Sequence, residues 1–310
     1  MEQKDKEIKN KEIRNKEIRW AGTKLGIFLI CHQLLFQIGT AVAMLMLVLV
    51  FEDIPDMLMY YASDMMQIIT GIMFVFLYVL NRQNIKNNPI IKSKLESSSL
   101  IKGIVVVIGI NMLISTIEIL CRRAFGVCLM PVNISSSMNV KENFVAYMLC
   151  VAVFPAVVEE ILYRGVLYRV LRKHGVMFVG ISSSIIFGLT YMNFVQIPFA
   201  IVLGLVACYL YEKTGRLRYS MLVHFINNAV SVVLSVLPLE VVDTMQVVMG
   251  VLFALGIIIY KSKHKSFIKK CSDRYEKGAA RDVLCYFTSI PMLLLVVGCI
   301  IVSCLMIEFM

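Results

Sequence analysis

Two adjacent glutamates and an arginine, set in an apolar stretch, are the side chains of this sequence best suited to chemistry. They are Glu159, Glu160 and Arg164. On a helix, Glu160 and Arg164 lie one turn apart on the same face, so they can neutralise each other as an ion pair. Glu159 points about 100° away around the helix and cannot share that pairing equally. We therefore expect Glu159 to be a carboxylate without an obvious partner, in surroundings of low polarity that suit a general base. The alternative is that both glutamates only bind neighbouring basic residues at the helix end.

A proline precedes the glutamates by one helical turn. Pro155 has no backbone N–H, so it leaves the carbonyl of Val151 without its usual helical partner. Membrane helices tolerate such a carbonyl mainly where protein or a wet cavity lines it. The proline therefore predicts that protein or a wet cavity lines this stretch.

Two later stretches carry polar side chains at helical spacing. In His224-Phe-Ile-Asn-Asn228, His224 and Asn228 share one helix face, and paired donors of this kind can stabilise a developing oxyanion. An intramembrane histidine that only bonds a neighbouring helix is the alternative. In Phe187-Gly-Leu-Thr-Tyr191, Phe187 and Tyr191 also share a face, and such an aromatic pair ordinarily packs in a core.

The composition shows which elements must hold these residues. Of 310 residues, 59% are hydrophobic and 17% charged, and the mean hydropathy is +0.78, which excludes a soluble globular protein. The net charge is +10, but the basic residues bracket long apolar stretches and do not form one face, so we expect no nucleic-acid partner. Nine cysteines, mostly within apolar runs and without a C-x-x-C pair, indicate neither a disulfide framework nor a zinc knuckle.

The apolar stretches predict an all-α, polytopic bundle of about eight or nine membrane helices. About 20 apolar residues are needed to cross roughly 30 Å of hydrocarbon. The organisation that we expect is a basic tail (1–24), N-terminal membrane helices (25–121), a core carrying the three stretches above (142–237), and C-terminal helices (241–310) with a basic loop (261–281). The candidate spans are 25–51, 57–80, 100–121, 142–168, 177–195, 197–212, 218–237, 241–260 and 284–307.

The positive charges predict the orientation of the spans. Most of the 31 Lys and Arg residues fall in alternate connections, whereas the connection 122–141 has only Arg122, Arg123 and Lys141. Because short cytoplasmic loops collect positive charge, we expect a multi-pass plasma-membrane protein with a cytoplasmic N-terminus. Its tail and basic loop would attract anionic membrane lipids.

Taken together, the three stretches resemble the CPBP family of intramembrane peptidases, which includes the CAAX-processing and bacteriocin-processing and immunity proteins. The family pattern is Glu-Glu-x-x-x-Arg, then Phe-x-x-x-His, then His-x-x-x-Asn. Here the order and spacing are met by Glu159-Glu160-Ile-Leu-Tyr-Arg164, Phe187-Gly-Leu-Thr-Tyr191 and His224-Phe-Ile-Asn-Asn228. The resemblance covers about residues 143–235.

The resemblance implies hydrolysis of a peptide bond within the membrane, in a membrane-associated or lipophilic peptide. Carried over from the family, Glu159 activates the attacking water, and Glu160 and Arg164 support it. His224 and Asn228 stabilise the oxyanion. A transporter is the alternative from another class, but the sequence lacks the repeated halves that many transporters show.

The second motif departs from the family, because Tyr191 stands where the family has a histidine, while Phe187 matches. A tyrosine hydroxyl, with a reference pKa of about 10, accepts protons poorly at neutral pH, whereas an imidazole near about 6.5 accepts them well. One hypothesis is therefore a weakened or specialised peptidase. The other is a member without catalysis that acts by binding, for example in bacteriocin immunity.

Members of the family are often described as metallopeptidases. A zinc site needs three ligands from His, Cys, Asp or Glu, and here only Glu159, Glu160 and His224 would be available. We therefore expect no metal or other cofactor, with zinc on these three residues as the alternative.

Overall fold

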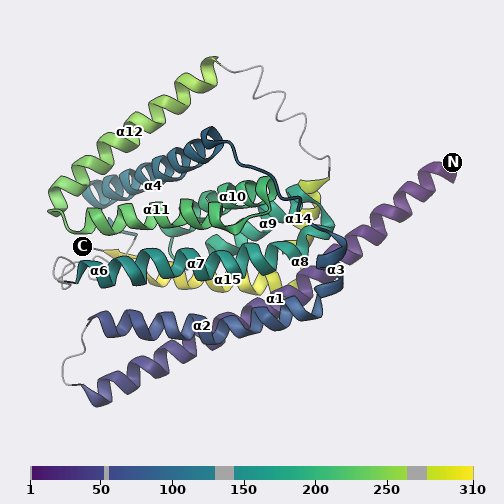
Figure 1. Cartoon of the computed structure of the whole chain (residues 1–310), viewed down its shortest axis with the longest axis horizontal. Helices are drawn as coiled ribbons and strands as arrows, with labels where there is room; N and C mark the ends of the chain where they lie inside the picture. Colours follow the sequence, from purple (N-terminus) through teal and green to yellow (C-terminus); the bar gives the residue numbers. More distant parts are fainter. Residues whose placement is uncertain (1, 52–55, 130–142, 264–277, 310) are drawn as a thin grey trace.

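The computed structural model describes residues 2–51, 56–129, 143–263 and 278–309, and Figure 1 shows them as a bundle of helices. Within these ranges the strands β1 (Val127–Cys128) and β2 (Glu308–Phe309) form one short antiparallel pair, with Val127 opposite Phe309. The predicted all-α membrane bundle is confirmed. The helices are α1 (Glu2–Val50), α2 (Asp56–Leu80), α3 (Arg82–Asn87), α4 (Ser97–Phe125), α6 (Phe144–Tyr147), η1 (Met148–Val153), α7 (Phe154–Glu160), η2 (Ile161–Tyr168), α8 (Arg169–Leu171), η3 (Arg172–His174), α9 (Val176–Leu189), α10 (Gln196–Thr214), α11 (Leu217–Ser235), α12 (Leu239–Lys263), α14 (Ala279–Phe287) and α15 (Ile290–Leu305).

Among the described residues, seven helical segments are long and apolar enough to cross a membrane. An eighth span results if α14 and α15, which are bent by 79° relative to each other, are counted together. The seven are Lys9–Val50, Leu58–Leu80, Ser97–Phe125, Phe144–His174, Gln196–Thr214, Leu217–Ser235 and Leu239–Tyr260.

The predicted span 177–195 is wrong. Helix α9 has 14 residues, which at 1.5 Å per residue gives about 21 Å, less than the hydrocarbon core. The chain leaves the helix in a turn where Met192 has a φ of 49°. Since a residue with a side chain rarely adopts this left-handed conformation, the turn ends α9 at a defined place. Tyr191 lies in this turn, two residues after the end of α9.

Helix α1 differs from the expected separation into a solvated tail (1–24) and a first span. It is continuous over 49 residues, and Ile18 is fully buried although it lies in the predicted tail. Helix α1 packs against α2, α14 and α15. Residues of the predicted tail are buried because α14 and α15, from the C-terminal part of the chain, pack against α1. The sequence near Ile18 gives no sign of this distant contact.

Polar contacts mark the two ends of the bundle. At one end, Arg14 of α1 donates hydrogen bonds to the carboxylate of Asp282 in α14 and to the backbone carbonyl of His174. At the other end, Arg122 of α4 bonds the carboxylate of Asp243 in α12. Connections that the charge pattern assigns to opposite sides of the membrane thus lie at opposite ends (Figure 1). Most of the predicted basic loop, residues 264–277, lies outside the described residues, and the cytoplasmic assignment stays a prediction.

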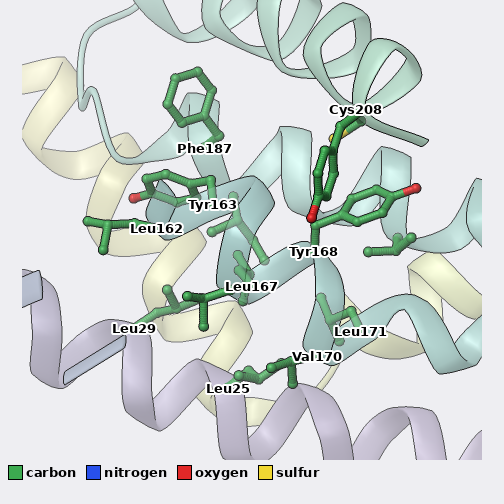
Figure 2. Close-up of a cluster of buried hydrophobic side chains, with 14 of the residues drawn as sticks. Leu25, Leu29, Leu162, Tyr163, Leu167, Tyr168, Val170, Leu171, Phe187 and Cys208 are labelled. Carbon is green, nitrogen blue, oxygen red and sulfur yellow. The ribbon is translucent and has the colours of Figure 1, made fainter. Parts of the chain in front are cut away.

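The main core lies where α1, η2 and α9 meet, as Figure 2 shows. Leu29 of α1 lies beside Leu167 of η2, Leu25 of α1 lies beside Val170 of α8, and Phe187 of α9 belongs to the same cluster. These side chains are almost fully buried. Inside a membrane, contacts of this kind stabilise the bundle mainly by close packing.

The segment with the two glutamates is one helical run, Phe144–His174, that contains two π-helical segments. The π-helical segments η1 and η2 flank α7, which carries Pro155, Glu159 and Glu160. π-helical turns often mark functional sites, because the extra residue re-aims the side chains that follow it. Helices α2 and α11 pack directly against this run.

Candidate active site

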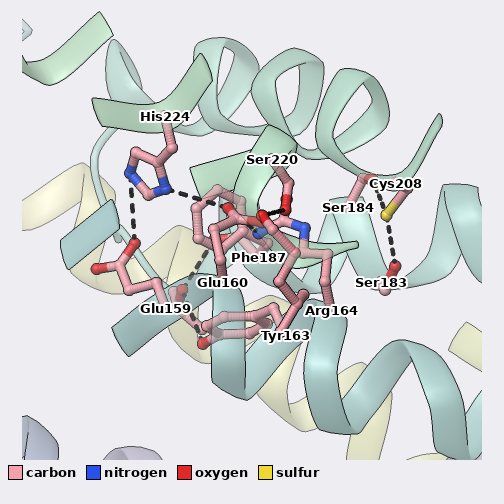
Figure 3. A network of polar contacts seen from close by, with 12 residues as sticks. Glu159, Glu160, Tyr163, Arg164, Ser183, Ser184, Phe187, Cys208, Ser220 and His224 are labelled. Atoms are coloured by element: carbon pink, nitrogen blue, oxygen red, sulfur yellow. Dashed lines mark hydrogen bonds and ion pairs between the residues drawn. The ribbon is translucent and has the colours of Figure 1, made fainter. Parts of the chain in front are cut away.

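Glu160 and Arg164 form the predicted ion pair. The Arg164 guanidinium donates to Glu160 Oε1 at 2.8 Å, and both side chains are buried, with 1% or less exposed. The guanidinium also lies 4.4 Å from the ring centroid of Phe187, a cation–π contact (Figure 3). A buried carboxylate is costly unless it is paired and hydrogen-bonded, so Arg164 makes a second glutamate tolerable at this depth.

His224 of α11 connects the two glutamates. Its Nδ1 lies 3.1 Å from Glu160 Oε1, and its Nε2 lies 3.9 Å from Glu159 Oε2 (Figure 3). An ionised carboxylate only accepts hydrogen bonds, so the nitrogen facing Glu160 carries a proton. The Nε2 atom is buried without a hydrogen-bond partner in the described part of the chain, and it faces the side of Glu159. The Glu160–Arg164 pair therefore orients His224 toward the other glutamate.

Glu159 has partners, contrary to expectation. Its Oε2 accepts a hydrogen bond from the hydroxyl of Tyr191 at 3.0 Å, and its Oε1 accepts one from the side-chain amide of Gln67 at 3.1 Å. Its side chain is 14% exposed, more than that of Glu160. The expectation of an unpartnered carboxylate is wrong because the partners come from α2 and from the turn after α9, which helix geometry within one segment does not place.

Asn228 supplies the partner that Pro155 removes. Its side-chain amide donates to the carbonyl of Val151 at 3.2 Å, the carbonyl that Pro155 deprives of its usual α-helical partner. Asn227 in turn donates to Asn228 Oδ1 at 3.1 Å, and Asn111 of α4 donates to Asn227 Oδ1 at 3.0 Å. This chain of three amides fixes the orientation of the Asn228 side chain. One N–H of the Asn228 amide is used by the carbonyl, and the second remains for another acceptor.

Phe187 and Tyr191 do pack as an aromatic pair, with ring centroids 5.5 Å apart in an edge-on arrangement. Phe187 also contacts the ring of His224 edge-on at 5.9 Å. The interpretation as core packing is correct for Phe187 and incomplete for Tyr191, because the Tyr191 hydroxyl bonds Glu159. All three motifs therefore meet around Glu159 and Glu160.

The residues do not fit a zinc site well. Of the three candidate ligands, Glu160 is already neutralised by Arg164 and bonded to His224, and the position where the family has a second histidine is Tyr191. Among the described residues, no group of three or more His, Cys, Asp or Glu side chains is placed to hold a metal ion. We therefore derive no chemical step through a metal.

Sequence reasoning did not find Gln67, Asn111 or Asn227 as parts of the site. All three are amides inside apolar helices. A polar side chain in such a helix usually bonds a partner, so these amides could have been recognised from the sequence as candidate members of a polar site. Asp64, one turn before Gln67, has Cys150 and Glu159 among its electrostatic neighbours. The side of α2 that faces α7 is therefore polar near the glutamates.

The segment that carries the three motifs is similar to known proteins. Residues 141–230 match the model of a family described as type II CAAX prenyl endopeptidase Rce1-like, and this segment carries all three motifs. The resemblance to the CPBP family is confirmed. The chain is also 25% identical over 135 residues to a Bacillus subtilis (strain 168) protein named "Putative membrane peptidase YdiL". That similarity covers 42% of this chain and 55% of the relative, so the chain spans about half the length of the curated relative it matches. No solved structure matches the chain.

Proposed function

We propose that the chain is an intramembrane endopeptidase in which Glu159 activates a water to cleave a membrane-associated or lipophilic peptide. The observation that carries the proposal is the convergence of Glu159 from α7, Tyr191 from the turn after α9, and His224 from α11. The Rce1-like match of residues 141–230 supports the same reaction class. Cleavage within a plasma membrane, with the N-terminus in the cytoplasm, fits the distribution of basic residues.

The proposed reaction is hydrolysis with general base catalysis. A water beside Glu159 Oε2 and His224 Nε2, which lie 3.9 Å apart, can contact both atoms. Glu159 takes one proton as the water oxygen attacks the peptide carbonyl carbon. In its doubly protonated form, His224 donates from Nε2 to the oxyanion while Nδ1 stays on Glu160. The C–N bond then breaks, and Glu159 returns the proton to the leaving amine, which gives a carboxylic acid and an amine.

Asn228 would add a second donor for the oxyanion. Its amide is held by Asn227 and by the carbonyl of Val151, so the remaining N–H has a fixed direction. A donor that needs no reorientation during the reaction stabilises developing charge better than a mobile one. In this proposal Asn111 and Asn227 position the Asn228 amide, and neither of them contacts the substrate.

With Tyr191 in place of a histidine, the site should hydrolyse peptides more slowly. Its hydroxyl occupies one lone pair of Glu159 Oε2 and accepts protons poorly at neutral pH. The loss of one acid–base partner costs about 100- to 10,000-fold in rate where that partner takes part in proton transfer. The competing proposal, a member without catalysis that binds a bacteriocin-like or other membrane peptide, rests on this same substitution.

The first test is a search for new peptide termini by mass spectrometry in membranes that contain the full chain. We expect termini that form with the wild type and are lost with Glu159→Gln. The matched control is Glu96→Gln, because Glu96 is an exposed carboxylate before α4 and far from the site in sequence. Equal termini from the wild type and from folded Glu159→Gln would overturn the proposed role of Glu159. Capture of an intact peptide without cleavage would favour the binding protein.

A further inference from the structure

A second polar site lies away from the glutamates, at the end of the bundle where α1, η3 and the beginning of α14 meet. It is a surface pocket of 520 Å³, within the size range of pockets for small organic ligands. We call it the interfacial pocket. The lining residues used below are Arg14, Lys173, His174, Ala279, Arg281 and Asp282.

The interfacial pocket has an excess of positive charge. Three basic side chains, Arg14, Lys173 and Arg281, share it with one acid, Asp282. Arg14 pairs with that acid and donates two hydrogen bonds to Asp282 Oδ2, at 2.7 and 2.9 Å. Arg281 lies further away, 3.9 Å from Asp282 Oδ1. Three basic side chains against one acid leave the pocket with a net positive charge, which favours an anion beside Lys173 and Arg281.

The beginning of α14 adds backbone donors to the pocket. The first bond inside this helix runs from the N–H of Asp282 to the carbonyl of Gly278, and no side chain caps the helix. The N–H groups of Ala279 and its two successors thus lack a partner within the helix. Such N–H groups, together with the helix dipole, favour phosphate and other anions.

Two buried polar atoms in the pocket also lack a partner. Asp282 Oδ1 belongs to a side chain that is 2% exposed, and neither it nor His174 Nε2 has a hydrogen-bond partner in the described part of the structure. Arg281 lies 3.9 Å from Asp282 Oδ1 without forming a hydrogen bond, and a buried acceptor without a hydrogen bond is costly, so a ligand with a hydroxyl donor would stabilise it. A phosphodiester group has no O–H to donate to a carboxylate oxygen, but a phosphodiester whose ester group carries hydroxyls can satisfy both kinds of site.

The orientation of α14 indicates where such a ligand would come from. Helix α14 is bent by 79° from α15, so if α15 crosses the bilayer, α14 lies close to the membrane plane. Leu284 on α14 is 65% exposed, whereas Tyr286 is fully buried against the core. A short helix with one apolar exposed side and one buried side is typical of the headgroup region. This places the interfacial pocket at the depth of phospholipid headgroups.

We propose that the interfacial pocket binds the headgroup of an anionic phospholipid that carries hydroxyl groups, as phosphatidylglycerol does. The phosphate accepts from Lys173, from Arg281 and from the N–H groups at the start of α14, and a headgroup hydroxyl donates to Asp282 Oδ1. Because Asp282 also accepts hydrogen bonds from Arg14, a lipid bound to Asp282 acts on the contact that joins α14 to α1. This site is independent of the proposed peptidase reaction.

Native mass spectrometry of the full chain in detergent tests the proposal. Dioleoyl phosphatidylglycerol, dioleoyl phosphatidylcholine and inorganic phosphate are titrated separately onto the wild type, onto Lys173→Gln/Arg281→Gln and onto Lys92→Gln/Lys94→Gln. Lys92 and Lys94 are exposed lysines that match the variant in charge, and the backbone beside them contacts the end of α10. The thermal unfolding midpoint of each variant shows that it is folded.

We expect one phosphatidylglycerol to bind the wild type at least about tenfold more tightly than phosphatidylcholine, and the pocket variant to lose about tenfold, since each basic residue near a membrane surface contributes to anionic lipid binding. The control variant should bind as the wild type does. If the control variant lost as much affinity for phosphatidylglycerol as the pocket variant, the loss would come from general surface charge, and the proposed site would be wrong. Inorganic phosphate that displaces the lipid at low concentration would overturn the lipid as the ligand, and equal binding of both lipids would overturn the proposal entirely.

Discussion

The hydroxyl of Tyr191 donates a hydrogen bond to Glu159 Oε2 at 3.0 Å, and Nε2 of His224 lies 3.9 Å from the same oxygen. The residue that departs from the family pattern is thus in direct contact with the proposed catalytic base. Its substitution changes the chemistry of the site and not only its packing, because the hydroxyl competes with water for a lone pair of the carboxylate.

Tyr191→His should raise peptide cleavage by about 10- to 100-fold at neutral pH, because an imidazole can share proton transfer with Glu159. Tyr191→Phe, which removes the hydroxyl without adding a base, is the matched control and should not produce this gain. Rates of terminus formation measured by mass spectrometry compare the three proteins. If Tyr191→His is folded and no faster than the wild type, the weakened-peptidase hypothesis is wrong.

Gln67 should act as a positioning residue for Glu159. Its amide donates to Glu159 Oε1 at 3.1 Å, so Gln67→Met leaves the carboxylate oriented by the Tyr191 bond alone and lets it turn more easily. We expect kcat to fall by about tenfold, of the order of one hydrogen bond to a charged group, with KM nearly unchanged. Gln83→Met, in the short helix α3, is the control, since Gln83 is exposed and bonds only Asn87 among the described side chains. A rise in KM without a change in kcat would show instead that Gln67 binds substrate.

Arg164→Met should destabilise the protein strongly, by about 3–5 kcal/mol, because it leaves the carboxylate of Glu160 buried without its partner. The double variant Glu160→Gln/Arg164→Met removes both charges and should recover part of that loss. Thermal unfolding of the purified full chain measures both. The exposed Arg218→Met is the control, and a double variant less stable than Arg164→Met would contradict a charge-pairing role.

The bond from Asn228 to the carbonyl of Val151 predicts coupling with Pro155. Asn228→Leu should cost about 1–3 kcal/mol of stability, since the carbonyl loses its partner. Pro155→Ala restores a backbone N–H one turn after Val151, so Asn228→Leu should cost less stability in that background. A double-mutant cycle on thermal unfolding gives the coupling. Cleavage should stay impaired in the double variant, and strictly additive stability changes would contradict the coupling.

Local helix geometry let the sequence predict much of the site. Glu160 and Arg164 pair as their four-residue spacing requires, and the carbonyl of Val151 needs a partner because Pro155 has no N–H. Both relations hold within one helical run, whatever the rest of the chain does. The all-α class and most membrane spans followed from the length of the apolar stretches.

The relations between helices were decided by the tertiary structure alone. Helix α9 ends before it can cross the membrane, which turns Tyr191 toward Glu159, and α2 brings Gln67 to the other carboxylate oxygen. His224 reaches both glutamates because α11 packs with one particular rotation against α7. Spacing in sequence fixes directions around one helix axis. Which faces of different helices meet depends on how their side chains pack, and a single sequence does not specify this locally.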